Sequence, residues 1–382
     1  MIKFIFDLSD ALIKDKKILV RVDFNVPCQG GKITDDFRII KTLPLIRRLT
    51  RKGAKVILMS HLEGEDGIPS FAKIAGYLRK KYLPRLRFVP DVAGKDAQKQ
   101  VNLMRGGDVL LLENLRKDRR EKNNGRVFSK KLSGLADIYV NEAFSVSHRE
   151  HASVVGVPRL LPSYAGPLFL EEVRRLSKAL TPPHPFVLAL GGKKLSTKIG
   201  LLSKLFVRAD KVLIGGAMAN IFLRVRGLKI GRSFVEAGVL PDKKMLKSAK
   251  LFLPSDAVVL RGGRRHIVPV RNLAAQDIMY DIGPETVRLF KYQMRGSKFI
   301  LWNGPFGVIE KGFVDGSRDM AQALFRAYAE TIVGGGDTIS VLRRYKLLNK
   351  YTFVSTGGGA MLDFLAQGTL PGLEALKKSV GQ

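Results

Sequence analysis

FVLALGGKKLSTKI, residues 186–199, joins a short apolar run to a pair of glycines and then to a lysine-rich segment. The run from Phe186 to Leu190 has the length and composition of a buried β-strand. Gly191 and Gly192 follow at once, and glycine at the carboxyl end of a parallel strand lets backbone N–H groups approach phosphate closely. The stretch therefore predicts a strand of a parallel sheet that ends in a phosphate-binding loop.

Similar apolar runs recur along the chain and alternate with longer helical patterns. They span residues 18–22, 56–59, 109–112 and 138–140 in the first half and 211–214, 257–260, 299–302, 331–333 and 352–354 in the second. Alternation of compact strands with helices is typical of parallel sheets covered on both faces. The predicted fold class is α/β, with two Rossmann-like lobes.

The length of 382 residues favours two domains, because one ordinary core rarely grows so large. An amphipathic stretch from Leu168 to Leu180 lies between two proline clusters, and the second cluster ends it because proline cannot continue a helix. We predict a first domain at 1–166, a hinge helix at 167–181 and a second domain at 182–370.

Composition is that of a globular protein, with 45% apolar and 26% charged residues. The 66 Lys and Arg against 34 Asp and Glu give a net charge of +32, which is compatible with nucleic-acid binding, with steering of anionic substrates or with a generally basic lineage. The basic residues are spread thinly and lack interleaved aromatics, which favours a solvated surface over a nucleic-acid site.

Two further features bear on location. Cys28 is the only cysteine, so neither an intrachain disulfide nor a thiolate metal cluster can form. The start of the chain lacks the pattern of a signal peptide, and no apolar stretch approaches the ~18 residues of a membrane span. We expect a cytoplasmic protein without a membrane partner.

Glycine follows several strands of the second half, and five such exits on one lobe indicate a nucleotide site. Lys194 and Lys198, four residues apart, would share one helix face and hold polyphosphate, unless they are a solvated pair. Asp337 can hold Mg²⁺ or simply cap a helix, and Thr338 can contact phosphate. Neither a P-loop nor a dinucleotide fingerprint is present in the sequence.

Polar residues of the first half lie near predicted strand ends in the same way. They are Asp23, Asn25, His61, Arg116 and Arg149, together with Arg38 in the first turn of a predicted helix. Strand ends of a parallel sheet meet at one edge, so these side chains are expected to converge, and arginines suit a small phosphorylated acid. A metal site at His61, His148 and His151 is disfavoured because no ligand spacing links them.

The sequence resembles the phosphoglycerate kinases along nearly its whole length. The resemblance rests on VRVDFNVP (20–27), DDFRI (35–39), MSHL (59–62), LLENLR (111–116), NEAFSVSHREH (141–151), LGGKKLSTKI (190–199), LWNGPFGV (301–308), VGGGDT (333–338) and STGGGA (355–360). These motifs occur in the order and spacing of that family, and together they are highly specific.

The resemblance implies a first lobe for the triose, a second for MgATP, and a C-terminal segment, 371–382, that returns to the first lobe. Substrate-binding residues would be Asp23, Phe24, Asn25, Arg38, His61, Arg116 and Arg149. Nucleotide-binding residues would be Lys198, Gly215, Gly216, Asn303, Pro305, Glu310, Gly335, Gly336, Asp337 and Thr338. Catalysis would depend on Arg38, Lys194, Lys198 and Gly358, and Asp337 would hold Mg²⁺, the expected cofactor.

The implied reaction is reversible phosphoryl transfer between 1,3-bisphosphoglycerate and ADP, in glycolysis and gluconeogenesis, by a hinge-bending monomer with small-molecule partners only. The alternatives are an impaired relative that acts as a basic nucleic-acid-binding or scaffold protein, and another α/β kinase of a small carboxylate. One departure from the family stands out: Glu63 and Gly64 follow MSHL where glycine and arginine are usual. Arg119, Arg120 or Lys122 is the predicted substitute for that arginine.

Overall fold

The computed structural model describes residues 2–29, 32–63 and 69–379, and the chain divides into two compact units. The first consists of Met1–Val173 with Thr369–Gln382, and the second of Arg174–Gly368. The boundary falls inside helix α6 (Pro167–Ser177), which a 3₁₀ turn, η7 (Lys178–Leu180), extends. The amphipathic stretch predicted at 168–180 is thus helical, and its role as a hinge stays a prediction.

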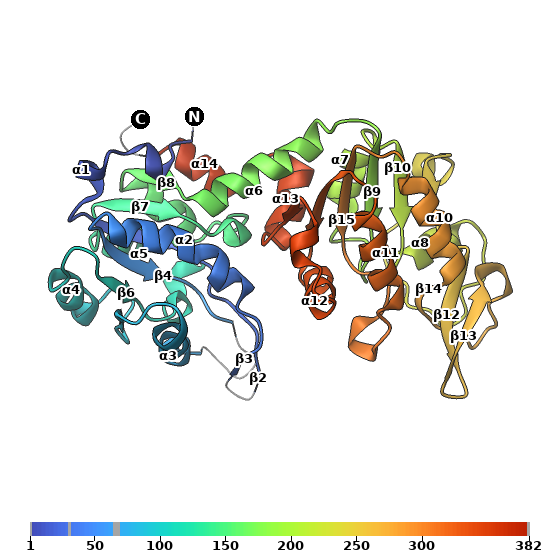
Figure 1. Ribbon diagram of the computed structural model, residues 1–382, viewed down its shortest axis with the longest axis horizontal. Coiled ribbons are helices and arrows are strands. Elements are labelled where there is room, and N and C mark those ends of the chain that lie inside the picture. The colour runs from blue at the N-terminus through green and yellow to red at the C-terminus, as the bar shows by residue number, and fades with distance from the viewer. Residues whose placement is uncertain (1, 30–31, 64–68, 380–382) are drawn as a thin grey trace. The chain divides into compact units, whose positions relative to one another are not determined.

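A six-stranded sheet forms the centre of the first unit, in the order β5-β6-β4-β1-β7-β8 (Figure 1). Its strands are β1 (Lys17–Arg21), β4 (Lys55–Met59), β5 (Leu86–Phe88), β6 (Val109–Leu111), β7 (Ile138–Asn141) and β8 (Ser163–Ala165). Every neighbouring pair is parallel. Strands buried on both faces must be apolar throughout, which explains runs such as Ile18–Val20 and Val56–Met59.

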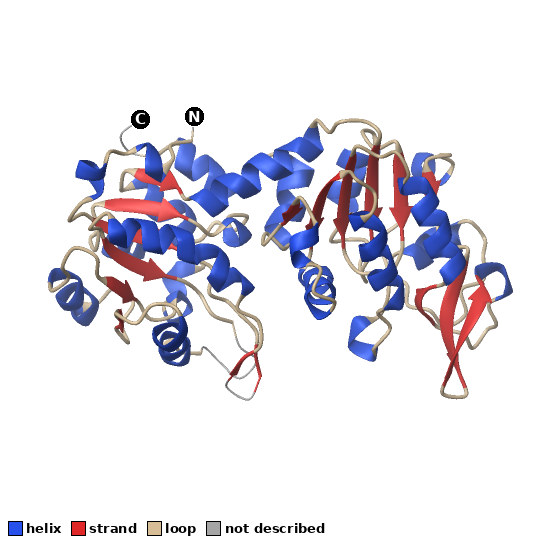
Figure 2. Cartoon of the chain, viewed as in Figure 1, coloured by secondary structure: helices blue, strands red, loops and turns tan. Residues whose placement is uncertain are grey.

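Helices cover both faces of this sheet, and Figure 2 shows the strands between them. The helices of the first unit are α1 (Asp10–Ile13), α2 (Phe37–Arg51), α3 (Ala72–Lys81), α4 (Lys95–Asn102), α5 (Arg126–Ser133) and α14 (Pro371–Lys377). A small hairpin joins β2 (Cys28–Gln29) to β3 (Lys32–Ile33). Although α14 lies near the end of the chain, Gly372 donates a backbone hydrogen bond of 2.8 Å to the carbonyl of Ser147.

The second unit repeats this architecture with a parallel sheet of order β11-β10-β9-β15-β16-β17. These strands are β9 (Phe186–Leu190), β10 (Lys211–Ile214), β11 (Leu251–Phe252), β15 (Phe299–Asn303), β16 (Glu330–Gly334) and β17 (Phe353–Val354). Its helices are α7 (Ile199–Phe206), α8 (Ala219–Val225), α9 (Lys243–Leu246), α10 (Pro284–Met294), α11 (Asp315–Phe325), α12 (Gly336–Arg344) and α13 (Gly359–Gln367). The predicted α/β class is confirmed.

One predicted strand belongs to a different sheet. The run at 257–260 forms β12 (Asp256–Arg261), which pairs antiparallel with β13 (Arg264–Pro269) and β14 (Met279–Ile282) (Figure 1). A four-residue apolar run carries no information about strand direction, so the sequence pattern could not separate it from the parallel sheet.

Candidate active site

Most predicted triose-binding residues of the first unit follow the carboxyl ends of adjacent parallel strands, and Arg38 lies in the first turn of α2. Asp23 and Asn25 follow β1, His61 follows β4, Arg116 lies in η2 (Leu115–Lys117) after β6, and Arg149 follows β7. These four strands are consecutive in the sheet, in the order β6-β4-β1-β7. The sheet therefore brings side chains that are distant in sequence to a single edge.

Asp23 organises the centre of this edge. Its Oδ2 lies 2.8 Å from Nη1 of Arg38 and also accepts the hydroxyl of Ser145, while its Oδ1 accepts the backbone N–H of Asn25 at 3.1 Å. Arg38 also donates to the carbonyl of Asn25 at 3.1 Å. Burial alone would raise the pKa of Asp23, but the charges of Arg38 and Arg21 and the Ser145 hydroxyl outweigh it and lower the pKa. The carboxylate stays ionised and fixes the Arg38 guanidinium.

His61 is held neutral beside this carboxylate. Burial, followed by the charge of Arg21, lowers the pKa of His61 well below its ordinary value. Its Nδ1 lies 3.3 Å from Nη2 of Arg21, and because a guanidinium only donates, Nδ1 accepts and the proton is on Nε2. The ring thus offers one N–H donor.

Arg116 and Arg149 meet at one carboxylate oxygen. Oε1 of Glu63 lies 3.3 Å from Nη2 of Arg116 and 3.1 Å from Nη1 of Arg149. The backbone N–H of Glu63 donates to Oδ1 of Asn25 at 3.2 Å, which joins this pair to the Asp23 cluster. Five of the seven predicted residues are therefore connected by direct contacts or through Glu63, and a sixth, His61, contacts the buried Arg21.

Phe24 differs from the other six. Its side chain is fully buried in the hydrophobic core, and its backbone N–H donates to Oγ of Ser60 at 2.9 Å. The ring therefore packs in the core, and a substrate contact through Phe24 stays a prediction.

Arg120 does not support the prediction that a nearby basic residue replaces the arginine that is usual in the family at position 64. Gly64 lies outside the described residues. The Arg120 guanidinium donates to both oxygens of Asp118, through Nε at 2.9 Å and Nη2 at 2.6 Å. Arg120 is therefore engaged within its own turn.

Sequence reasoning missed a buried network behind the site. Arg21 is fully buried and donates through Nε to Oγ of Ser153 at 3.0 Å, and this hydroxyl donates to Oε1 of Glu121 at 2.6 Å. Burial, only partly offset by Arg21, raises the pKa of Glu121. An arginine between Val20 and Val22 in an otherwise apolar strand was the signal available, because buried charges need partners.

Backbone packing holds the strand exits of the second unit together. Gly192 N–H donates to the Pro305 carbonyl at 2.7 Å, and Gly191 N–H donates to the Asn303 carbonyl at 3.0 Å. At Gly216 φ is +65°, and a Cβ there would lie 2.6 Å from the backbone nitrogen of Gly192. Only glycine fits this approach.

Two of the predicted phosphate ligands lie at the start of α12. Gly335 is its N-cap with φ +98°, and Oγ1 of Thr338 accepts the N–H of Gly304 at 3.0 Å. Asp337, in the first helical turn, is exposed. Partial burial of its carboxylate and then repulsion by Glu310 raise the pKa of Asp337, while Lys198 acts in the opposite direction.

The two lysines of the first exit have different surroundings. Lys198 is buried and its Nζ would lie 3.1 Å from a Cβ at Gly192, whereas Lys194 is exposed. Helix α7 begins only at Ile199, so the expectation that both lysines share a helix face is wrong. Burial lowers the pKa of Lys198, and the charges of Asp337 and Glu236 offset part of this effect.

Gly358 lies at the last glycine-rich strand exit of the second unit, between β17 and α13. It is the N-cap of α13 with φ +53°, and nothing lies within 4 Å of a Cβ built there. The preceding Gly357 donates its N–H to Oγ of Ser355 at 3.0 Å. The first turn of α13 therefore presents backbone donors to an open side, where an anion would be stabilised.

Comparison with known proteins agrees with this geometry. The family model described as phosphoglycerate kinase matches residues 8–368. The chain belongs to the phosphoglycerate kinase family. The phosphoglycerate kinase of Thermomicrobium roseum is 42% identical and covers 97% of this chain and 98% of its own length. That of Thermus thermophilus is also 42% identical, with 97% and 99% covered.

Solved phosphoglycerate kinases share the fold over the whole chain. The structure from Coxiella burnetii has a TM-score of 0.82 at 33% identity and covers 99% of both chains. The structure from Pyrococcus horikoshii has a TM-score of 0.87 at 29% identity and covers 98% of both. Family membership makes this chain a kinase, a phosphotransferase that depends on ATP or ADP.

A magnesium ion fits the residues at the start of α12. The described residues contain no group of three or more His, Cys, Asp and Glu side chains that could hold a metal. Mg²⁺ in phosphotransferases of this kind needs only one or two carboxylates, because substrate phosphates and waters supply the other ligands. The mutual repulsion of Asp337 and Glu310 is what a cation would relieve.

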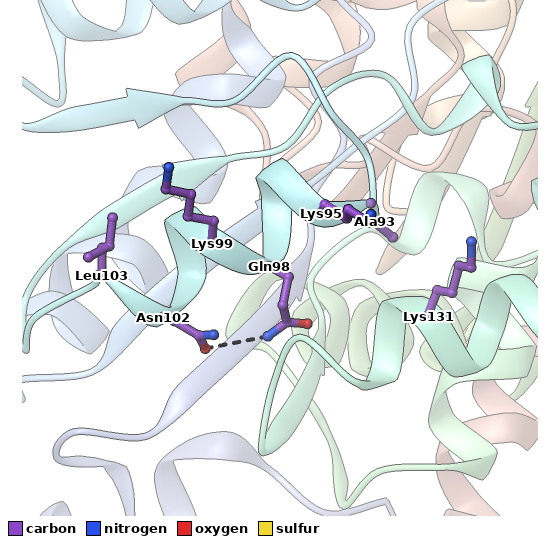
Figure 3. A pocket seen from close by; sticks show the side chains of 8 residues that line it. Ala93, Lys95, Gln98, Lys99, Asn102, Leu103 and Lys131 are labelled. Atoms are coloured by element: carbon purple, nitrogen blue, oxygen red, sulfur yellow. Dashed lines mark hydrogen bonds between the residues drawn. The ribbon is translucent and has the colours of Figure 1, made fainter.

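Of two cavities in the described residues, one lies away from the predicted site residues and one borders them. The larger, about 680 Å³, lies on α4 and α5 of the first unit and contains none of the predicted site residues (Figure 3). It is lined by Ala93, Gly94, Lys95, Gln98, Lys99, Asn102, Leu103 and Lys131. The smaller, about 20 Å³, borders Gly216 and includes Met279, Tyr280 and Phe306. Met279 and Tyr280 belong to β14 of the small antiparallel sheet.

Among the described residues, no helix combines the length and the apolar composition needed to cross a bilayer.

Proposed function

We propose that the protein catalyses reversible transfer of a phosphoryl group between 1,3-bisphosphoglycerate and ADP, which gives 3-phosphoglycerate and ATP. The observation that carries this proposal is that a chain of the phosphoglycerate kinase family retains both a connected cationic cluster in one unit and the glycine-rich strand exits in the other. The reaction is a step of glycolysis and gluconeogenesis.

The first unit would bind the triose. Arg38, Arg116 and Arg149 carry permanent charges that match a phosphate and a carboxylate. Asp23 and Asn25 would bind the triose through their polar side-chain atoms. Neutral His61 would donate a hydrogen bond from Nε2 without adding positive charge. Apart from Arg38, which lies on α2, these residues follow four strand ends, so the sheet helps to fix their positions.

The second unit would bind the nucleotide. Gly215 and Gly216 let two strand exits pack closely, and Gly336 leaves the backbone open at the start of α12. Asn303, Pro305 and Thr338 hold the exits together. Glu310 would contact the ribose. Asp337 would hold Mg²⁺, which when bound neutralises phosphate charge.

Chemistry would depend on alignment and charge neutralisation. The attacking carboxylate has an ordinary pKa of about 4 and is ionised at neutral pH, so no general base is required. Arg38, Lys194, Lys198 and the start of α13 at Gly358 would stabilise the transferring group. Since the two ligand sets belong to different units, transfer requires closure, for which we propose α6 as the hinge.

The proposed partners are small molecules only, for a monomer in the cytoplasm. A coupled assay with 3-phosphoglycerate and MgATP tests the proposal. We expect turnover that Asp337→Ala reduces at least about a hundredfold, because the metal loses its protein ligand. Retention of RNA at physiological salt without turnover would instead support a nucleic-acid-binding scaffold.

A further inference from the structure

Glu63 introduces a negative charge into the cationic cluster of the first unit. It follows His61 and Leu62 at the exit of β4, and its Oε1 contacts Nη2 of Arg116 at 3.3 Å and Nη1 of Arg149 at 3.1 Å. Its backbone N–H donates to Asn25. Three of the side chains that would bind the triose thus converge on one residue that the proposed reaction does not use.

The two arginines need an anion between them. Burial and then the charge of Arg149 lower the pKa of Arg116, and Glu63 partly offsets both effects. Like charges in a partly desolvated site repel strongly, so an oxyanion there is stabilising. In the structure, the Glu63 carboxylate supplies that anion.

The partners in this ion pair differ in their freedom to separate. The Arg116 side chain is 6% exposed, whereas the Glu63 side chain is 55% exposed. A buried guanidinium cannot leave without losing its packing, but an exposed carboxylate can turn into water at little cost. Displacement would therefore move Glu63 and leave Arg116 in place.

Arg116 also retains an unused donor. Its Nε is buried and has no hydrogen-bond partner among the residues that the structure describes. A buried donor without a partner is unfavourable, so the single oxygen of Glu63 does not satisfy this guanidinium. A phosphate or carboxylate with several oxygens can accept from more than one nitrogen of the fork.

We propose that Glu63 is an internal competitor of the triose substrate. Its carboxylate occupies the Arg116–Arg149 pair in the free protein, and an anionic group of the substrate displaces it on binding. Glu63 thereby sets the affinity of the triose site and leaves the nucleotide site unaffected. This inference rests on the proposed function.

Calorimetry on the full chain with 3-phosphoglycerate tests the inference. Glu63→Gln should tighten binding by between about twofold and thirtyfold, the range expected for loss of two ion pairs that share one exposed carboxylate and that binding must break. Glu63→Asp keeps the charge and should stay closer to the wild type. In the coupled assay, KM for 3-phosphoglycerate should fall in Glu63→Gln while kcat and KM for MgATP stay constant, a split that a purely structural role would not produce.

Glu150→Gln is the matched control, because it removes the same charge from an exposed glutamate next to Arg149 in the chain. Equal tightening in both variants would overturn the inference by reducing it to long-range electrostatics. Unchanged or weaker binding in Glu63→Gln would also overturn it, while leaving the proposed function intact. A wild type that neither binds 3-phosphoglycerate nor turns it over would refute the proposed function and the inference together.

Discussion

Asp281 couples the stability of the second unit to pH. Its carboxyl group lies on β14, 5% exposed, and accepts the N–H of Ile282 at 2.9 Å and that of Gly316, at the start of α11, at 3.0 Å. Burial, assisted by the nearby Asp315, raises the pKa of Asp281 to about 7 despite these hydrogen bonds. We therefore expect Asp281→Asn to change how stability depends on pH.

The sign follows from proton binding. The folded state binds a proton at Asp281 more tightly than the unfolded chain, whose aspartates titrate near a pKa of about 3.9. The stabilisation from this group is fully present below about pH 4 and is lost as pH rises through about 7. Between about pH 5 and pH 8 the wild type should lose roughly 2 to 3 kcal/mol of unfolding free energy through this group. The asparagine of the variant does not titrate, so the variant should gain relative to the wild type by that amount across this range.

Trp302 provides the assay. It is the only tryptophan, is fully buried, and lies on β15 of the same unit, so its fluorescence reports the unfolding of that unit by urea. The quantity to compare is the difference in unfolding free energy between variant and wild type at about pH 5, 6, 7 and 8. Any constant cost of the amide cancels in this comparison. Asp242→Asn, which removes an exposed carboxylate from the same unit, is the control. A difference for Asp281→Asn that stays constant across the range would refute the reasoning.

Two further predictions concern catalysis. Lys198→Ala should lower kcat roughly a hundredfold while binding of 3-phosphoglycerate, measured by calorimetry, stays nearly intact, because the buried ammonium lies against Gly192 in the second unit. Lys204→Ala, which removes an exposed lysine, is the control. A loss of triose binding comparable to the loss of kcat would contradict the assignment. Raising salt from low to physiological concentration should raise KM for both anionic substrates more than it changes kcat, since the Debye length is about 10 Å at 0.1 M; a kcat that collapses at constant KM would speak against this.

Most strands of the two parallel sheets were predictable because their centres are continuous apolar runs. Phe186–Leu190 and Lys211–Ile214 form strands with the predicted limits, since burial on both faces favours apolar residues in succession. The short edge strands β5, β8 and β11 were not predicted, because two or three residues carry too little pattern. The direction of β12 was missed for the reason that pairing partners decide it.

The site was predictable in its residue types but not in its contacts. Strand-end positions placed Asp23, His61 and Arg149 at one edge of a sheet, and the structure confirms that they lie at strand ends of the same sheet. The contact between Glu63 and Arg149 joins residues 86 positions apart, and it depends on loop paths that no local pattern encodes. No local pattern encodes the burial of Lys198 against Gly192 either, because that contact depends on the residue at which α7 begins.

The excess of positive charge therefore has different meanings at the surface and in the site. Although the chain carries a net charge of +32, carboxylates pair with the cations of the triose site: Asp23 with Arg38, and Glu63 with Arg116 and Arg149. Surface charge acts over distances that salt screens, and it influences how often an anion arrives. The paired groups act at contact distance around a buried guanidinium, where screening is weak, and they decide how tightly the anion is held. Encounter and affinity are thus set by different residues, and a change at Glu63 should alter affinity without removing the dependence of KM on salt.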